Sequence, residues 1–179
     1  MKSVRVFFGA LLTLGCIGCS QAPAGPDTKT ADTKAKDLAD IKALEDRFTA
    51  ALKAKDVNAI MTAYVPDDSL IVFDATPPRQ YKGAQAYRKD FEDFLGMFPG
   101  EIQADLSDLD ITVGSGGDVA FGHSIQHGAG TMKDGKKAEF TVRVTDGYKK
   151  VNGQWLIAHE HVSFPVDFAT GKADLSSKP

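Results

Sequence analysis

The chain has 179 residues, of which 42% are hydrophobic and 25% charged, and its formal net charge is −3. These values are typical of one soluble globular domain with short additions. No basic segment with interleaved aromatic residues is present, which excludes the common classes of nucleic-acid-binding protein.

The N-terminus has the pattern of an export signal. Two basic residues precede the apolar run 6–14, which is too short to span a bilayer as a mature helix. Two Gly-Cys pairs follow, and they resemble a bacterial lipoprotein signal, in which the cysteine is lipidated and becomes the new N-terminus. Cys16 fits this pattern somewhat better, and Cys19 is the competing site. An ordinary secretory signal and an uncleaved anchor are the alternatives.

We therefore predict a signal over residues 1–19 and an exported lipoprotein of the bacterial cell envelope, anchored in a membrane and facing the periplasm or the cell exterior. Residues 20–36 contain no large apolar residue and are predicted to be a flexible tether. The domain follows over 37–168, and 169–179 is predicted to be a loose tail. Both cysteines lie in the signal, so the domain has no disulfide and depends on a hydrophobic core.

Three helices are predicted early in the domain. Apolar residues recur at three- and four-residue spacing over 37–55, which indicates an amphipathic helix. Asp56 is the predicted N-cap of a short helix over 57–64. A strand is predicted over 69–74 from its run Leu-Ile-Val-Phe, and a third helix over 83–98.

Four long strands are predicted next, over 102–113, 118–132, 138–151 and 154–166. Turn signals separate them: a glycine-rich segment at 114–117, Asp-Gly at 134–135 and Asn-Gly at 152–153. Helices followed by an antiparallel meander indicate an α+β domain.

Several segments carry a resemblance to a known family. They are Ala51-Leu52-Lys53-Ala54-Lys55-Asp56, Pro66-Asp67-Asp68, Gly83, Arg143-Val144-Thr145 and the run from Gly153-Gln154-Trp155 through His159-Glu160-His161-Val162-Ser163. In this element order they resemble the NTF2-like superfamily, and within it the SnoaL-like and ketosteroid-isomerase-like proteins. The last run also resembles the association domain of calcium/calmodulin-dependent kinase II.

The resemblance covers the whole domain and implies an NTF2-like cone. Three N-terminal helices would pack on a strongly curved antiparallel β-sheet that leaves a pocket at its open end. It also implies a homodimer formed through the sheet. Its motifs are specific for fold and weak for function, because this fold hosts many unrelated activities.

The ketosteroid isomerase mechanism offers a first test of the pocket. Those enzymes use an Asp base and an oxyanion hole made by a Tyr and a protonated Asp. The resemblance places Asp74 at or next to the base, but Phe48 in the tyrosine position and Val142 near the second aspartate. Two of three groups are missing, so steroid isomerisation by that mechanism is not expected.

Strand alternation and the family comparison supply the other candidates. His123 and His127 share one strand face with Phe121, and the kinase association domains have a basic pocket residue near His123. The comparison also places Asp146 in the pocket, and Glu160 by parity. Candidate catalytic residues are Asp74, His123 and Asp146, and candidate pocket residues are Phe48, Tyr64, Phe91, Phe94, Phe121, His127, Val142 and Glu160.

The opposite, dimer-forming face is assigned to the remaining polar and aromatic residues of this region. They are Trp155, His159, His161 and Arg143, and Trp155 is also interpreted as a core residue. A β-bulge would reverse part of this assignment, and whether the two histidines face the pocket or the interface is left open.

No metal or cofactor is predicted. Alternation separates Glu160 from His159 and His161, and the domain has no free cysteine, nucleophile elbow or phosphate-binding glycine loop.

Two functions remain: a lipid-anchored domain that binds a small apolar or acidic molecule in its cone without turnover, or an isomerase, cyclase or dehydratase that uses Asp or His as general acid or base. We favour binding, because no complete catalytic set can be assembled.

Overall fold

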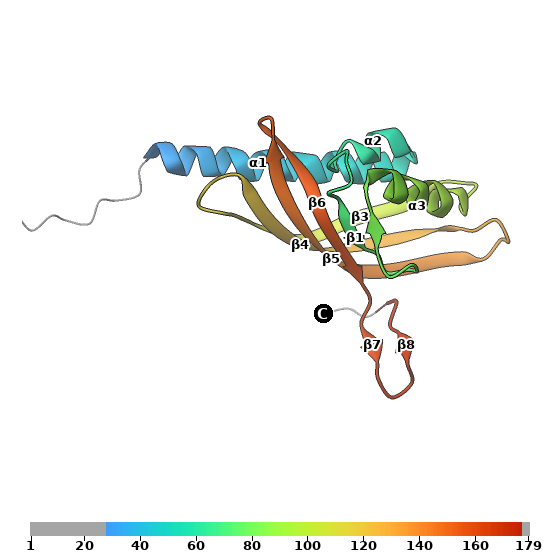
Figure 1. Cartoon of the computed structure of the whole chain (residues 1–179). Coiled ribbons are helices and arrows are strands. Elements are labelled where there is room, and N and C mark those ends of the chain that lie inside the picture. The colour runs from blue at the N-terminus through green and yellow to red at the C-terminus, as the bar shows by residue number, and fades with distance from the viewer. Residues whose placement is uncertain (1–27, 177–179) are drawn as a thin grey trace, which may run out of the picture.

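A curved sheet of six strands, covered on one face by three helices, forms the body of the protein, in a computed structural model that describes residues 28–176 (Figure 1). The helices are α1 (Thr28–Ala54), α2 (Val57–Met61) and α3 (Ala84–Gly96). The strands are β1 (Ile71–Phe73), β2 (Tyr81–Lys82), β3 (Ile102–Val113), β4 (Val119–Thr131), β5 (Lys137–Val151), β6 (Gln154–Ser163), β7 (Val166–Asp167) and β8 (Lys172–Ala173).

The predicted α+β arrangement is confirmed, but the sheet is mixed rather than purely antiparallel. Its order is β2-β1-β6-β5-β4-β3, and β3 to β6 form the antiparallel meander that the turn signals predict. Strand β1 runs parallel to β6, with Ile71 opposite His159. A parallel neighbour needs a long crossover rather than a hairpin, and here α3 and the meander supply it.

Two segments differ from their expected form. Helix α1 begins at Thr28, inside the segment predicted to be a tether, since Ala and Lys favour a helix even without an apolar face. The two Cys candidates lie outside the described residues. No helix among residues 28–176 combines the length and the apolar character that a membrane span requires.

The second difference is at the C-terminus, where β7 and β8 pair as a hairpin that projects away from the helices (Figure 1). The Thr141 amide of β5 donates to the Leu175 carbonyl at 2.8 Å, and the Asp174 amide donates to the Pro165 carbonyl at 2.8 Å. Strand β6 ends at Ser163, opposite Arg143. The C-terminal segment therefore bonds to β5 beyond the point where β6 has ended.

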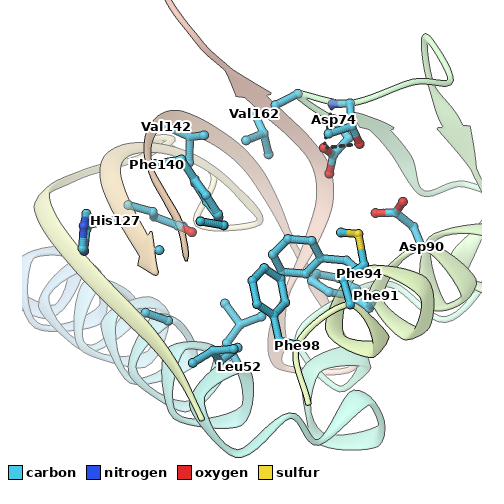
Figure 2. Close-up of a pocket in the computed structure, with 18 of the residues that line it drawn as sticks. Leu52, Asp74, Asp90, Phe91, Phe94, Phe98, His127, Phe140, Val142 and Val162 are labelled. Atoms are coloured by element: carbon cyan, nitrogen blue, oxygen red, sulfur yellow. Dashed lines mark hydrogen bonds between the residues drawn. The ribbon is translucent and has the colours of Figure 1, made fainter. Parts of the chain in front are cut away.

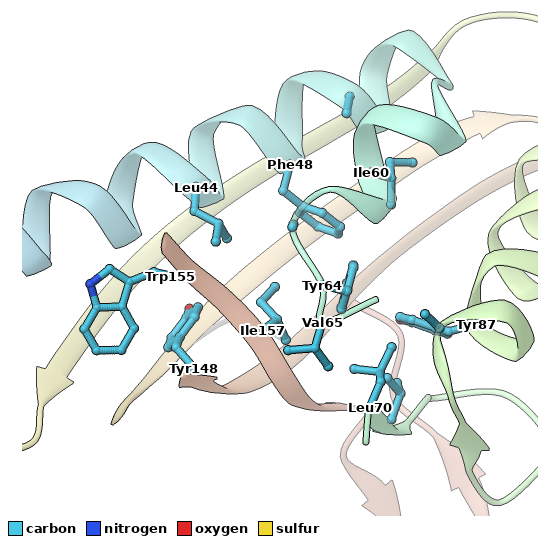
Figure 3. Packing of buried hydrophobic residues seen from close by; sticks show 14 of the residues in the cluster. Leu44, Phe48, Ile60, Tyr64, Val65, Leu70, Tyr87, Tyr148, Trp155 and Ile157 are labelled. Carbon is cyan, nitrogen blue, oxygen red and sulfur yellow. The ribbon is translucent and has the colours of Figure 1, made fainter. Parts of the chain in front are cut away.

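Part of the hydrophobic core lies between α1 and the β5–β6 hairpin (Figure 3). Ile41, Leu44 and Phe48 stand on one face of α1 at helical spacing, and Trp155 and Ile157 face them from β6. Burying a side chain of this size contributes about 1.5–3 kcal/mol. The indole nitrogen of Trp155 also donates to Asp37 at 3.1 Å, which satisfies its polar atom.

The placement of Trp155 on the outer face is therefore wrong, and its interpretation as core is right. A bulge explains the reversal: Gly147 pairs with His159, but Tyr148 pairs with Ile157, so Ala158 is the extra residue. An extra residue shifts the alternation, so Trp155 and Glu160 point to the same side of the sheet. His159 and His161 stand on the outer side, where both rings contact Phe73.

Candidate functional site

A cavity of about 590 Å³ lies between α3 and the concave face of the sheet (Figure 2). Its walls are mostly apolar, and the aromatic residues among them are phenylalanines and one tyrosine: Phe48, Phe91, Phe94, Phe98, Phe140, Phe164 and Tyr87. A space of this size is typical of sites that take small organic molecules.

Helical spacing on α3 builds one wall. Tyr87, Phe91 and Phe94 follow one another at four and three residues, so they share a face of the helix. The rings of Tyr87 and Phe91 are 4.7 Å apart, and Phe91 also meets Phe48 of α1 at 6.2 Å. These ring contacts fix the wall without filling the space in front of it.

Small residues on β4 make room on the opposite wall. A Cβ on Gly128 would come within 2.6 Å of Phe140, and one on Gly130 within 2.8 Å of Phe98. Both distances are shorter than van der Waals contact, so these positions require glycine while the rings keep their places. The cavity thus depends on large rings facing glycines.

Glu160 marks the polar end of the cavity. Its side chain lies 4% exposed, and its two carboxylate oxygens accept from the hydroxyls of Tyr64, at 2.7 Å, and Tyr87, at 2.5 Å. The Tyr87 hydroxyl also lies 3.4 Å from an oxygen of Asp74, which follows β1. A hydroxyl has one proton, so Tyr87 donates to Glu160 at the shorter distance and leaves Asp74 its own acceptor capacity.

A second buried polar group lies behind Glu160. Asp146 of β5 is its direct cross-strand neighbour and is 3% exposed, and its Oδ1 has no hydrogen-bond partner among the described residues. On α1, the buried Glu45 accepts from the Tyr148 hydroxyl at 2.8 Å. Three carboxyl groups and three tyrosines thus form one buried layer between the cavity and the core: Glu45, Asp146, Glu160, Tyr64, Tyr87 and Tyr148.

Burial decides the protonation of this layer. It raises the pKa of Glu160 to about 7, although the hydrogen bonds from Tyr87 and Tyr64 act in the opposite direction. Burial likewise raises the pKa of Glu45 to about 6. The pKa of Asp146 is held well above its usual range by burial and by the neighbouring Glu160 and Glu45 carboxyls. All three shifts favour the protonated form of the carboxyl group over the charged form.

Further acidic groups stand near the same end. The Asp90 carboxylate accepts from the Tyr81 hydroxyl at 2.5 Å, and burial raises the pKa of Asp90 with a further contribution from Asp74. The other oxygen of Asp74 accepts from the Thr76 amide at 3.1 Å. Figure 2 shows Asp74 and Asp90 on the same side of the cavity.

The sequence-predicted residues divide into three groups. Those that line the cavity are Phe48, Asp74, Phe91, Phe94, His127, Val142 and Glu160. Tyr64 and Asp146 are buried next to Glu160 but do not line the cavity. His127 stands at the edge, where its ring contacts Glu139 at 3.2 Å on the neighbouring strand.

His123 and Phe121 form the third group, and their placement in the pocket is wrong. Both side chains are exposed, Phe121 to 54%, and His123 contacts neither Asp74 nor Asp146. The even-numbered neighbours Gly122 and Ser124 face inward instead and are buried. A Cβ on Gly122 would come within 3.2 Å of the Tyr148 hydroxyl, so the inward face of β4 has little room for a larger side chain at this position.

Sequence reasoning missed Glu45, Tyr148 and Asp90 as site residues. Glu45 interrupts the apolar face of α1 four residues after Ile41 and three before Phe48. An acid in such a position signals a buried carboxyl with a partner. Among residues 28–176, no three His, Cys, Asp or Glu side chains meet as a metal site would require.

Comparisons with known proteins agree with this architecture. An NTF2-like protein of unknown function from Pseudomonas putida KT2440 is 30% identical, with a TM-score of 0.70 over 83% of this chain and 98% of that one. A protein from Novosphingobium aromaticivorans DSM 12444, provisionally named a scytalone dehydratase, is 19% identical, with a TM-score of 0.65 over 74% and 86%.

An NTF2-like superfamily protein from Salmonella enterica serovar Typhimurium LT2 is 18% identical, with a TM-score of 0.66 over 81% of this chain and 99% of that one. Functionally curated proteins give no match. The model of the SnoaL-like domain matches residues 41–167, which is most of the chain. The chain therefore belongs to the SnoaL-like domain family, within the NTF2-like fold.

Proposed function

We propose that the domain binds a small, largely apolar molecule in its conical cavity. The observation that carries this proposal is a cavity of about 590 Å³ with phenylalanine walls and one polar end. A small apolar molecule would remove these phenylalanine faces from water on binding, and such burial contributes about 25 cal/mol per Å² of apolar surface. The buried Glu160 is already satisfied by two tyrosines, as expected of a binding site without turnover.

The test uses the neutral fluorescent probe N-phenyl-1-naphthylamine, which brightens in apolar surroundings. We expect saturable brightening with the purified protein. Ala104→Phe places a ring in the cavity, because Ala104 lines it opposite Gly128, and should weaken probe binding about tenfold or more. Ala50→Phe adds the same ring on the exposed side of α1 and should leave binding unchanged. No brightening, or equal binding by both variants, would exclude the proposal.

General acid–base catalysis is the second candidate. The observation in its favour is that Tyr87 lies between Glu160, with a pKa of about 7, and the accessible Asp74. The provisional dehydratase name of one similar structure points in the same direction. The test follows by NMR the exchange of the α-protons of 4-phenylbutan-2-one for deuterium. The exchange rate with the wild-type protein should then exceed the rate in buffer alone, and Glu160→Gln should return it to the buffer rate. Wild-type exchange at the buffer rate would exclude this candidate.

We also propose that the protein is an exported lipoprotein and a homodimer. The Gly-Cys pairs after the apolar run support lipid attachment. The test is incorporation of a labelled fatty acid, which should be lost when Cys16 and Cys19 are both replaced by Ser. The exposed aromatic side chains of Phe73 and Phe121 on the outer sheet face support the second. A monomer in sedimentation experiments at micromolar concentration would exclude the dimer.

A further inference from the structure

Negative charge is concentrated at one end of the cavity. Four carboxyl groups line the cavity: Asp74, Asp90, Asp93 and Glu160. None of the described lining residues is a lysine or an arginine, and the one imidazole, His127, stands on the opposite side in Figure 2. The charge at this end is therefore not balanced by the cavity itself.

Neighbouring side chains balance only one of the four groups. Asp93 is exposed and pairs with Lys89 at 2.7 Å. No salt bridge of the described residues involves Asp74, Asp90 or Glu160, and their hydrogen-bond partners are hydroxyls and one backbone amide. Protein sites usually pair such carboxylates with a cation when they lie close together in a sheltered place.

We infer that the cavity selects amphiphilic cations, with a protonated amine next to Asp74 and Glu160 and an apolar body against the phenylalanine walls. This inference rests on the proposed ligand-binding function and adds the chemical class of the ligand. An ammonium group offers three donors. The Asp74 oxygen that faces Tyr87 receives only the long 3.4 Å contact, so it can accept one of them.

Two further physical effects act in the same direction. Burial raises the pKa of Glu160 and of Asp90, and the negative charge of Asp74 adds to both shifts, so these groups repel one another. A cation at this end would relieve that repulsion. Phenylalanine faces also attract cations through the ring quadrupole, and Phe91 and Phe94 lie beside the acidic end in Figure 2. An acidic ligand would meet only repulsion here.

The experiment compares three ligands with one apolar body: 4-phenylbutylamine, 4-phenylbutan-1-ol and 4-phenylbutanoate. Each displaces N-phenyl-1-naphthylamine from the wild-type protein at pH 7.5. We expect the amine to bind about tenfold or more tighter than the alcohol, and the carboxylate to bind more weakly than both. Equal affinities, or a preference for the carboxylate, overturn the inference. The probe's own binding stays as the separate test of the proposed function.

A charge variant assigns the selectivity to the acidic end. Asp74→Asn keeps an acceptor for the Thr76 amide but removes the charge, so it should reduce amine affinity about tenfold more than alcohol affinity. Asp46→Asn removes the same charge from the exposed side of α1 and should change neither. If Asp74→Asn weakens amine and alcohol equally, the amine does not lie beside Asp74 and the inference fails.

Discussion

The same strands build both ends of the cone, yet only one end is filled. At the closed end, Trp155 and Ile157 of β6 pack against α1 and are 4% and 1% exposed. A few residues along the same strand, Glu160 and Val162 face a cavity of about 590 Å³. Phenylalanines line this open end, whereas the side chains of Ile41, Leu44, Trp155 and Ile157 fill the closed one. The difference indicates that the closed end supplies stability, whereas the open end retains space at a cost in stability.

The buried carboxyl–tyrosine layer separates the two ends. Its tyrosine hydroxyls satisfy Glu45 and Glu160 while the aromatic rings of Tyr64 and Tyr148 belong to the core. Such a layer is tolerated only when its polar atoms are paired. The unpaired Oδ1 of Asp146 is the exception, and it lies next to the group at the polar end of the cavity.

The largest expected effect comes from truncating one side chain at each end. Ile157→Ala leaves a void in the filled end and should lower the free energy of unfolding by about 4 kcal/mol. Val162→Ala enlarges a space that is already open, so the loss should be about 1 kcal/mol. Urea denaturation of both variants measures the difference. Equal losses would show that the open end is as tightly packed as the closed one.

The polar layer should make stability depend on pH. Glu160 and Glu45 have folded-state pKa values of about 7 and about 6, above the unfolded value of 4.5, so the unfolded chain loses these protons first as the pH rises. Their contribution is complete below about pH 4.5 and is lost as the pH rises to about 7. For Glu160 alone the loss should be about 3 kcal/mol.

Denaturation midpoints at pH 5 and pH 7.5 measure this effect, with Glu160→Gln as the comparison. Gln does not titrate, so the difference between the two midpoints should shrink in the variant. A wild-type profile that is flat over this range, or one that Glu160→Gln leaves unaltered, would mean that the layer keeps its charges in the fold.

The smallest expected effect concerns the outer face. His123→Ala removes an exposed imidazole on the side of the sheet away from the cavity, so probe affinity should stay within about twofold of the wild type. The same fluorescence titration used for Ala104→Phe measures it. A tenfold loss of affinity would place His123 in the cavity after all and contradict the orientation of β4.

The fold was more predictable than the site, for identifiable physical reasons. Helical spacing in α3 and the turn signals between β3 and β6 are local, and they predicted those elements to within a few residues. Glu160 and Val162 both line the cavity, and strand parity relates them simply because no bulge lies between them. Trp155 lies beyond the bulge at Ala158, and no local sequence pattern predicted that bulge.

His123 was misplaced because alternation divides a strand into two faces without saying which one is inward. Contacts distant in the sequence decide that choice, here the approach of Tyr148 to Gly122. The same limit explains why the layer was missed: Glu45 and Tyr148 are 103 residues apart. The available signal for the inward face of β4 was a set of small residues at alternate positions, Ala120, Gly122, Ser124, Gly128 and Gly130, with Gln126 as the exception.

The bond between Thr141 and Leu175 has a consequence for how the molecule behaves at high concentration. Where β6 has ended, β5 would otherwise present free amides and carbonyls, a template on which strands of other copies can grow into aggregates. The segment after the C-terminal hairpin, at Leu175, occupies part of that template, so it should reduce aggregation. Light scattering should show more aggregation at high concentration for a chain that ends at Phe168 than for the full chain.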